Sequence, residues 1–352
     1  MKKKLAFVII ILLFINLAGC NQGQNKNTNE NLLTNPYKRT EFMMGTIVNL
    51  KIYDKDKETV LDAAFKRMET LANSITVNEA SSEVDKINDQ AGKQPVKVSK
   101  DIFELIETGL DYSEKSAGSF DISIGPLTNL WRIGFPDARK PSQSEINDVL
   151  PLIDYKQVKM NKEEQTVFLN KENMQLDLGA IAKGFITDEV VELLKKNGVT
   201  TAIIDLGGNI FVMGKSPSSG EEWGVGIQDP FLSRGEVIGV IRESNKSIVT
   251  SGIYERYLKV DEETYHHLLN PEDGYPFNND IAGVSVITKK SMDGDALSTA
   301  IFSKGIDGGL KFVETMDDVE AIFVSKDKKI YLTSGLKETF EVTNSEFEVV
   351  NY

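Results

Sequence analysis

Segments with apolar residues at every second position alternate along the chain with segments whose apolar residues recur every three or four positions. The first pattern is typical of a half-buried β-strand and the second of an amphipathic helix. The strands predicted in this way are 46–53, 201–204, 224–228, 236–241, 257–260, 282–288, 321–324 and 330–333. The predicted helices are 59–73, 102–114 and 185–196. This alternation indicates a mixed α/β or α+β domain with a large core.

The amino-terminal segment follows neither pattern. Three lysines at 2–4 precede an apolar run over 5–17 that is too short to span a bilayer comfortably, which is typical of a secretory signal. The run ends in Leu-Ala-Gly-Cys, which resembles the bacterial lipoprotein signal, where cleavage leaves the Cys to carry a lipid with palmitate. We therefore expect a signal peptide over 1–19 and a membrane anchor on Cys20. An ordinary signal peptide with an incidental Cys is the alternative.

Composition sets the limits of the folded part. The stretch 21–35 is rich in Asn and Gln and nearly free of apolar residues, so 20–36 is expected to be the lipidated Cys and a flexible tether, followed by one domain over 37–340. Cys20 is the only cysteine, which excludes a disulfide and a Cys-based metal site. The net charge of -13 argues against nucleic acid or an anionic membrane surface as a partner, because phosphate-rich partners require clustered Lys and Arg.

A loop of small residues is the first candidate for chemistry. Residues 176–184 read Leu-Asp-Leu-Gly-Ala-Ile-Ala-Lys-Gly and lead directly into the predicted helix 185–196. Small residues let a ligand approach the backbone closely, and the free N–H groups of a helix N-terminus together with Lys183 suit a phosphate. Neither a P-loop nor a dinucleotide-binding glycine pattern is present, so simple packing of the helix against a sheet is the alternative.

An acidic turn opens a second helical segment over 291–302. Asp295 and Thr299 are four residues apart, so a helix places them on one face. A carboxylate and a hydroxyl are hard oxygen donors, which suit Mg²⁺ better than zinc or copper. The alternative is that an acidic residue in a first turn serves only as a cap.

Both histidines of the chain lie together before a Pro-Glu-Asp-Gly turn. His266 and His267 are adjacent, so in an extended strand they face opposite sides and cannot easily bind one metal together. One of them is a candidate base while the other packs, and ordinary hydrogen-bonded histidines are the alternative. A further polar cluster, 119–127, leaves strand-like alternation at a Gly-Pro turn.

Taken together, the ordered motifs resemble those of the ApbE family, the FAD:protein FMN transferases, from about residue 37 to about residue 333. The residues that carry the resemblance are Met44-Gly45-Thr46, Ser119-Phe120-Asp121-Ile122-Ser123, Gly125-Pro126-Leu127, Leu130-Trp131, the 176–184 loop, Asp205-Leu206-Gly207-Gly208-Asn209, Thr250-Ser251-Gly252, His267-Leu268-Leu269-Asn270-Pro271 and Asp295-Ala296-Leu297-Ser298-Thr299-Ala300.

The resemblance implies a T-fold-like core of mixed sheets with packed helices, which binds FAD as substrate. It also implies that Mg²⁺ is held by the backbone carbonyl of Ala180, the carboxylate of Asp295 and the hydroxyl of Thr299. The residues that would contact FAD are Met44, Ser119, Phe120, Asp121, Asp177, Lys183 and Leu269. Many relatives have a Tyr that stacks on the flavin nucleotide before a Ser-Glu pair. Here residues 75–78 read Ile-Thr-Val-Asn, so no stacking partner is named.

The reaction implied is attack of a Ser or Thr hydroxyl of an extracytoplasmic target protein on the FMN-side phosphorus of FAD, with AMP leaving. His267 is the first candidate for the base, since its ordinary pKa lies near neutrality, and Asp177 or Asp293 is the alternative. If water replaces the hydroxyl, the same site is an FAD pyrophosphatase that gives FMN and AMP. A flavin-binding lipoprotein without catalysis is a further alternative, although a pure binder needs neither metal ligands nor a base.

Overall fold

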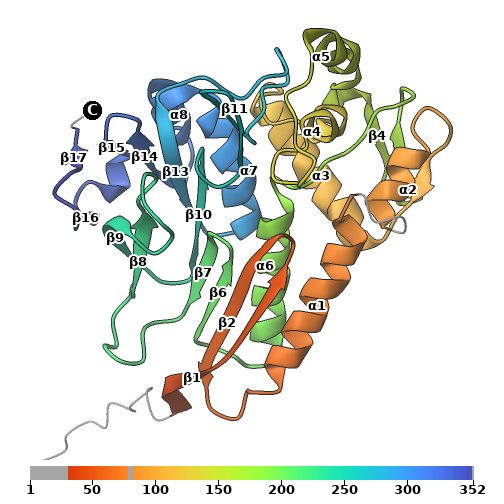
Figure 1. The fold of residues 1–352 in the computed structure, drawn as a ribbon. Helices are drawn as coiled ribbons and strands as arrows, with labels where there is room; N and C mark the ends of the chain where they lie inside the picture. The colour runs from red at the N-terminus through yellow and green to blue at the C-terminus, as the bar shows by residue number, and fades with distance from the viewer. Residues whose placement is uncertain (1–30, 78–81, 351–352) are drawn as a thin grey trace, which may run out of the picture.

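The computed structural model describes residues 31–77 and 82–350 (Figure 1). The predicted signal peptide, Cys20 and most of the predicted tether lie outside these residues. The prediction that the tether extends to residue 36 is wrong, because strand β1 begins at Leu32, which pairs with Asp54 of β2. Backbone pairing does not require apolar side chains, so the polar composition hid it. The predicted domain end at 340 is also too early, since the last strand ends at Val349.

A nine-stranded sheet forms the centre of the molecule (Figure 1). Its strands lie in the order β1-β2-β6-β7-β10-β13-β14-β15-β17, and every neighbouring pair is antiparallel except β15 with β17. In this order they span Leu32–Met43, Thr46–Asp54, Ala202–Leu206, Asn209–Met213, Lys246–Gly252, Ile281–Thr288, Glu320–Ser325, Lys329–Leu332 and Glu348–Val349.

Helices pack against one face of this sheet and enclose the main core. They are α1 (Val60–Ile75), α3 (Lys100–Lys115), α6 (Ala182–Lys196), α7 (Ser291–Phe302) and α8 (Gly305–Val313). Val48, Leu50 and Ile52 alternate along β2 and are fully buried in this core, as the period of two predicts. The helices therefore hold the sheet on one side, and α6 and α7 lie next to each other within that layer.

The opposite face of the sheet carries a second, smaller sheet of β16 (Glu341–Val342), β9 (Val237–Glu243) and β8 (Trp223–Gln228). Trp223 and Ile241 of the small sheet share an apolar cluster with Ile248 and Ile287 of the large one. The large sheet is thus covered on both faces over β10 and β13. This explains why β13 is buried along its whole length.

The remaining elements gather at the end of the molecule that also carries α4 (Figure 1). They are α2 (Glu83–Asp89), α4 (Gly125–Trp131), α5 (Gln143–Val149), the sheet of β3 (Val96–Lys97), β5 (Thr166–Leu169) and β4 (Val158–Asn161), the hairpin of β11 (Tyr257–Val260) and β12 (Glu263–His266), and 3₁₀ helices at Leu150–Leu152 and Tyr155–Gln157. A further 3₁₀ helix, Ser334–Leu336, lies elsewhere, next to β14 and the apolar cluster of the small sheet. Several of them pack around Trp131, which is fully buried.

The prediction of a mixed α/β fold is confirmed, and each predicted helix and strand is present with ends that move by at most three residues. None of the helices in 31–77 and 82–350 has the length and apolar character needed to cross a membrane.

Candidate functional site

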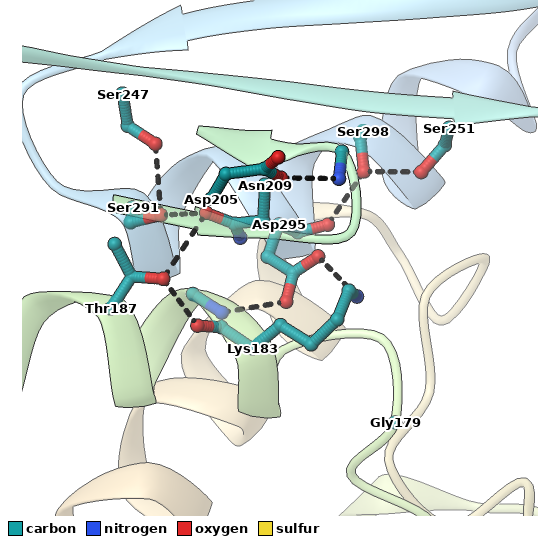
Figure 2. A network of polar contacts seen from close by, with 12 residues as sticks. Gly179, Lys183, Thr187, Asp205, Asn209, Ser247, Ser251, Ser291, Asp295 and Ser298 are labelled. Atoms are coloured by element: carbon teal, nitrogen blue, oxygen red, sulfur yellow. Dashed lines mark hydrogen bonds and ion pairs between the residues drawn. The ribbon is translucent and has the colours of Figure 1, made fainter. Parts of the chain in front are cut away.

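Helices α6 and α7 meet near their N-termini, and the candidate site is built around that meeting point (Figure 2). Asp295 of α7 is almost fully buried and accepts a hydrogen bond from the backbone N–H of Gly184 at 2.8 Å. Its other oxygen lies 3.1 Å from Nζ of Lys183. A β-carbon on Gly184 would lie 2.4 Å from the carbonyl oxygen of Ser291, so only glycine permits this approach of the two helices.

The two helices cap each other. Asp188 of α6 accepts hydrogen bonds from the backbone N–H groups of Ser291 and Met292 at 2.7 and 3.0 Å, in the first turn of α7. Asp295 does the same for the first turn of α6 through Gly184. Burial raises the pKa of Asp188 to about 6. Each helix N-terminus thus receives a carboxylate from its neighbour, which offsets N–H groups that lack intrahelical partners.

A buried polar network lies beside the Lys183–Asp295 pair (Figure 2). The side-chain oxygen of Asn209, at the start of β7, accepts from the hydroxyls of Ser291 and Thr187. Ser247 of β10 donates to Ser291 at 2.8 Å. The side-chain nitrogen of Asn209 is buried and has no partner among the described residues. The network ties β7 and β10 to the two helices and keeps their N-termini in place.

The segments that carry the ion pair also contain two oxygen atoms with no hydrogen-bond donor. Gly184 donates to Asp295, and within 31–77 and 82–350 nothing donates to the carbonyl of Ala180 or bonds the hydroxyl of Thr299. Thr299 lies one turn beyond Asp295 on α7, as predicted. The described residues contain no group of three or more His, Cys, Asp or Glu side chains suited to a metal. A cation at this position would therefore be held by one carboxylate and neutral oxygens, a donor set that fits Mg²⁺.

Asp177 stands at the start of the small-residue loop and organises it. One carboxylate oxygen accepts from the N–H of Gly179 at 2.8 Å and the other from the hydroxyl of Thr128 on α4 at 2.7 Å. Its own N–H donates to the carbonyl of Ile122 at 2.9 Å. The loop that enters α6 is thereby joined to the 119–127 cluster, two segments that the sequence left unconnected.

Within that cluster, Asp121 is turned inward. Its carboxylate accepts from the N–H and hydroxyl of Ser123 and from the N–H of Tyr155, and burial raises its pKa. Phe120 is also buried, whereas Ser119 is half-buried and donates to the carbonyl of Ser116. Of these three residues, only Ser119 leaves side-chain surface open to a ligand.

The two histidines have different surroundings. His266 uses both ring nitrogens within the fold: Nε2 donates to the carbonyl of Phe277 at 2.9 Å and Nδ1 accepts from the N–H of Leu268. Burial lowers the pKa of His266 to about 4. His267 donates from Nδ1 to the carbonyl of Arg256 at 3.2 Å, because a carbonyl oxygen only accepts. Its Nε2 therefore carries the free lone pair.

The electrostatic surroundings keep His267 neutral. Burial, and then the positive charge of Arg256, lowers the pKa of His267 well below its ordinary value, and Lys183 contributes in the same direction. A neutral imidazole with an open Nε2 is able to accept a proton.

The other predicted residues are placed less directly. Met44 has a left-handed backbone (φ 54°) in the turn between β1 and β2, and a β-carbon on its neighbour Gly45 would lie 3.3 Å from the guanidinium of Arg256. Leu269 is buried in the cluster around Trp131. Burial raises the pKa of Tyr112 on α3, and the nearby carboxylate of Asp293 raises it further. Residues 78–81 of the loop lacking an aromatic residue lie outside the described part.

Arg256 is the main site residue that sequence reasoning missed. It was missed because strand β12, which pairs with β11, was not predicted from the sequence. In the β11–β12 hairpin Tyr257 is paired with His266, so the register places Arg256 opposite His267, and the backbone N–H of His267 donates to Arg256 at 3.1 Å. Thr128 and Ser247 were also missed, since isolated hydroxyls carry no pattern.

Fold and site together define an α/β protein in which a helix N-terminus, a lysine and a buried carboxylate meet at one place. Residues 44–323 match the model of the ApbE family. The chain belongs to the ApbE family.

Relatives and solved structures agree with this assignment. The chain is 37% identical over 315 residues to a protein named FAD:protein FMN transferase of Klebsiella pneumoniae (strain 342), covering 90% of this chain and 97% of that protein. It is 34% identical to the one of Treponema pallidum (strain Nichols), covering 88% and 90%. The crystal structure of an ApbE protein from Thermotoga maritima is similar with a TM-score of 0.79 at 29% identity, covering 86% of this chain and 99% of that one.

Proposed function

We propose that this chain is a FAD:protein FMN transferase, which moves FMN from FAD to a Ser or Thr hydroxyl of a target protein and releases AMP. The observation that carries the proposal is the Lys183–Asp295 contact at the N-terminus of α6, beside the unused oxygens of Ala180 and Thr299. Family relatives that align over nine-tenths of their length bear this name.

The pyrophosphate of FAD is the part of the substrate that suits the start of α6. Phosphate oxygens bind at helix N-termini, where N–H groups point outward, and Lys183 adds a full positive charge. The residues proposed to contact FAD are Met44, Ser119, Phe120, Asp121, Asp177, Lys183 and Leu269. Because Phe120, Asp121 and Leu269 bury their side chains, they contribute through the main chain and the shape of their loops.

Mg²⁺ is proposed to bind the carbonyl of Ala180, the carboxylate of Asp295 and the hydroxyl of Thr299. When bound there, the ion would neutralise charge on the pyrophosphate and on the departing AMP. Asp295 also accepts a hydrogen bond from Lys183. This lysine therefore lies beside the proposed ion, and the two positive charges would neutralise the same phosphate group.

Proton removal from the acceptor hydroxyl is assigned to Nε2 of His267. The hydroxyl oxygen forms a bond to the FMN-side phosphorus, the bond from this phosphorus to the AMP phosphate breaks, and the proton passes to the imidazole. Nδ1 is held as a donor by the carbonyl of Arg256, which keeps Nε2 free. Asp177 and Asp293 remain the alternative bases. Both carboxylate oxygens of Asp177 already accept hydrogen bonds. Asp293 already interacts with Tyr112.

Water in place of the acceptor hydroxyl would turn the same site into an FAD pyrophosphatase. Both reactions break the same phosphorus–oxygen bond of FAD and differ only in the nucleophile. The product therefore depends on whether an acceptor protein is bound at the site.

The site of action is proposed to be the outer face of the cell membrane, with Cys20 as the lipid-bearing residue. The supporting feature is the order of three segments in residues 2–20: three lysines, then an apolar run, then Leu-Ala-Gly-Cys. The acceptor would then be an extracytoplasmic protein, and the chain would obtain FAD outside the cytoplasm.

The test uses the soluble chain from Asn21, FAD and Mg²⁺ with a cell-envelope extract from the source strain. Flavin fluorescence that stays with one protein band after denaturation, and that requires both FAD and Mg²⁺, is the expected result. FMN and AMP in solution without any labelled band would instead indicate the pyrophosphatase, and intact FAD with saturable binding would indicate a binding protein.

A further inference from the structure

Several exposed apolar side chains lie in segments that Arg256 and Arg234 contact. In the described part of the chain eight large apolar side chains are exposed. Six of them lie in four segments, and we call these six the apolar rim: Phe42 and Ile47 at the ends of β1 and β2, Phe135 after α4, Phe231 and Leu232 in the β8–β9 connection, where Phe231 stacks on Phe347, and Tyr257 at the start of β11. The other two, Val342 and Val349, lie on the short strands β16 and β17.

Arg256 joins two of these connections to the site. A β-carbon on Gly45, in the β1–β2 turn, would lie 3.3 Å from its Nη2, and one on Gly134, next to Phe135, would lie 3.0 Å from its Cδ. The carbonyl of Arg256 accepts from Nδ1 of His267. The side chain of Arg256 therefore lies between the hairpin and the 132–139 connection, while its backbone holds the residue proposed as base.

The β8–β9 connection also approaches the tip of the β1–β2 hairpin. A β-carbon on Gly208, in the β6–β7 turn, would lie 3.9 Å from the guanidinium of Arg234, and Gly207 in that turn packs on Thr46 of the β1–β2 hairpin. Gly208 also accepts from the N–H of Thr250, two residues before the end of β10. Arg234, with Phe231 and Leu232 beside it in sequence, thus borders the hairpin tip.

The hairpin tip presents the most exposed part of the rim. Phe42 and Ile47 are directly opposite each other across the two strands, and they are 76% and 49% exposed. Val48 and Leu50 point into the core, so Ile47 and its partner Phe42 point away from the helix layer. Two large apolar side chains paired in water favour a partner that covers them.

The charged residues near the apolar rim indicate which kind of partner would bind there. Arg39, Arg67, Arg132 and Arg139 each form an ion pair with a carboxylate. Arg234, Arg242 and Arg256 have no ion pair within 31–77 and 82–350, and two of these three stand at the rim. Unpaired guanidinium groups in a chain of net charge -13 are complementary to carboxylates.

We propose that the apolar rim with Arg234 and Arg256 is the docking surface for the acceptor protein, whose hydroxyl-bearing segment presents an apolar side chain to Phe42 and Ile47 and a carboxylate to Arg256. The inference rests on the proposed transferase function. It assigns acceptor recognition to the rim and FAD binding to the start of α6, so the two can be separated experimentally.

The test uses the acceptor protein that becomes flavin-labelled in the envelope extract, purified and added to the soluble chain. Phe42→Ser with Ile47→Ser is expected to raise the KM for this acceptor about tenfold or more, and Arg256→Gln to raise it similarly. The KM for FAD and the slow hydrolysis of FAD by water should stay unchanged in the hairpin variant, which also shows that it is folded. Val342→Ser with Val349→Ser, and Arg242→Gln, are the matched controls and should behave as wild type.

Each other outcome has a definite meaning. If wild type labels no protein, the proposed transferase function fails, whatever the variants do. If wild type labels the acceptor and the hairpin variant has the same acceptor KM, the docking surface is wrong and the function stands. Vesicles of phosphatidylcholine with phosphatidylglycerol provide the last comparison. Sedimentation of the soluble chain with them, lost in the hairpin variant while transfer is unaffected, would assign the rim to the membrane and overturn the proposal.

Discussion

Asp295 accepts from Lys183 with one carboxylate oxygen and from Gly184 with the other, so removing its carboxylate leaves two groups on α6 without partners. We expect Asp295→Ala to lower FMN transfer about 100-fold or more and to lower the free energy of unfolding by about 1–3 kcal/mol. Asp295→Asn, which keeps the size and can still accept from Gly184, should be more stable than Asp295→Ala but equally inactive.

Transfer rates at saturating FAD and urea unfolding measure the two effects. Asp318 pairs with Lys289 at the surface, so Asp318→Ala is the control and should change neither quantity. An active Asp295→Ala would remove this carboxylate from the proposed Mg²⁺ ligands.

His267 is expected to act through its free Nε2. His267→Gln should lower kcat about 100-fold with little change in the affinity for FAD. Because its pKa is already well below the ordinary value, kcat/KM of the wild type should stay level between pH 8 and 6 rather than fall near 6.5. The contrary result would be a wild-type kcat/KM that falls to half near pH 6.5, together with a His267→Gln variant in which this pH dependence is absent. It would contradict the surroundings described for His267.

His266 makes stability depend on pH. Its pKa falls from 6.5 to about 4 on folding, so below pH 6.5 the unfolded chain binds a proton that the folded chain does not. The contribution to stability is complete above 6.5 and is lost as the pH falls toward 4. We expect His266→Gln, which can still donate to Phe277, to make the drop in unfolding free energy between pH 7 and pH 5 smaller by about 2 kcal/mol. Urea unfolding at the two pH values measures this, and an unchanged drop would be the contrary result.

At the scale of elements, the mutual capping of α6 and α7 requires their close approach at Gly184. We expect Gly184→Ala to cost about 1–3 kcal/mol, since its methyl group would meet the backbone of Ser291 and Met292. Gly224→Ala, whose β-carbon would make an ordinary 3.5 Å contact with Val240, is the control. Thermal unfolding compares the two variants, and equal midpoints would mean that the helices can separate without cost.

Local pattern predicted the helices and strands whose side chains alternate clearly, such as α1 and β13. It missed β10, whose sequence Lys-Ser-Ile-Val-Thr-Ser-Gly mixes small polar residues with few apolar ones, and α8, which contains three glycines. Both are held by tertiary packing, which overrides weak local preference.

The candidate site was predicted in its parts but not in its arrangement. Lys183 and Asp295 were both named, but their contact spans 112 residues and leaves no trace in local spacing. The same holds for Asp177 with Thr128 and for His267 with Arg256, which depend on loops brought together by the sheet order. The chemistry of a residue is visible in the sequence, whereas its partner is decided by topology.

At the scale of the whole molecule, the proposed anchor places the enzyme at the membrane. We expect Cys20→Ala to move the protein from the membrane fraction of producing cells to the soluble fraction, with transfer activity in solution unchanged. Fractionation followed by immunoblotting measures this, and Cys20→Ala that still sediments with membranes would argue against lipid attachment at this residue.

The most direct measurement is the intact mass of the purified acceptor after incubation with FAD, Mg²⁺ and the soluble chain, together with the amount of AMP formed. The expected result is a gain equal to FMN minus water and one AMP for each modified acceptor, both absent with Asp295→Ala. AMP and free FMN formed in equal amounts, with the acceptor mass unchanged, would contradict the transferase.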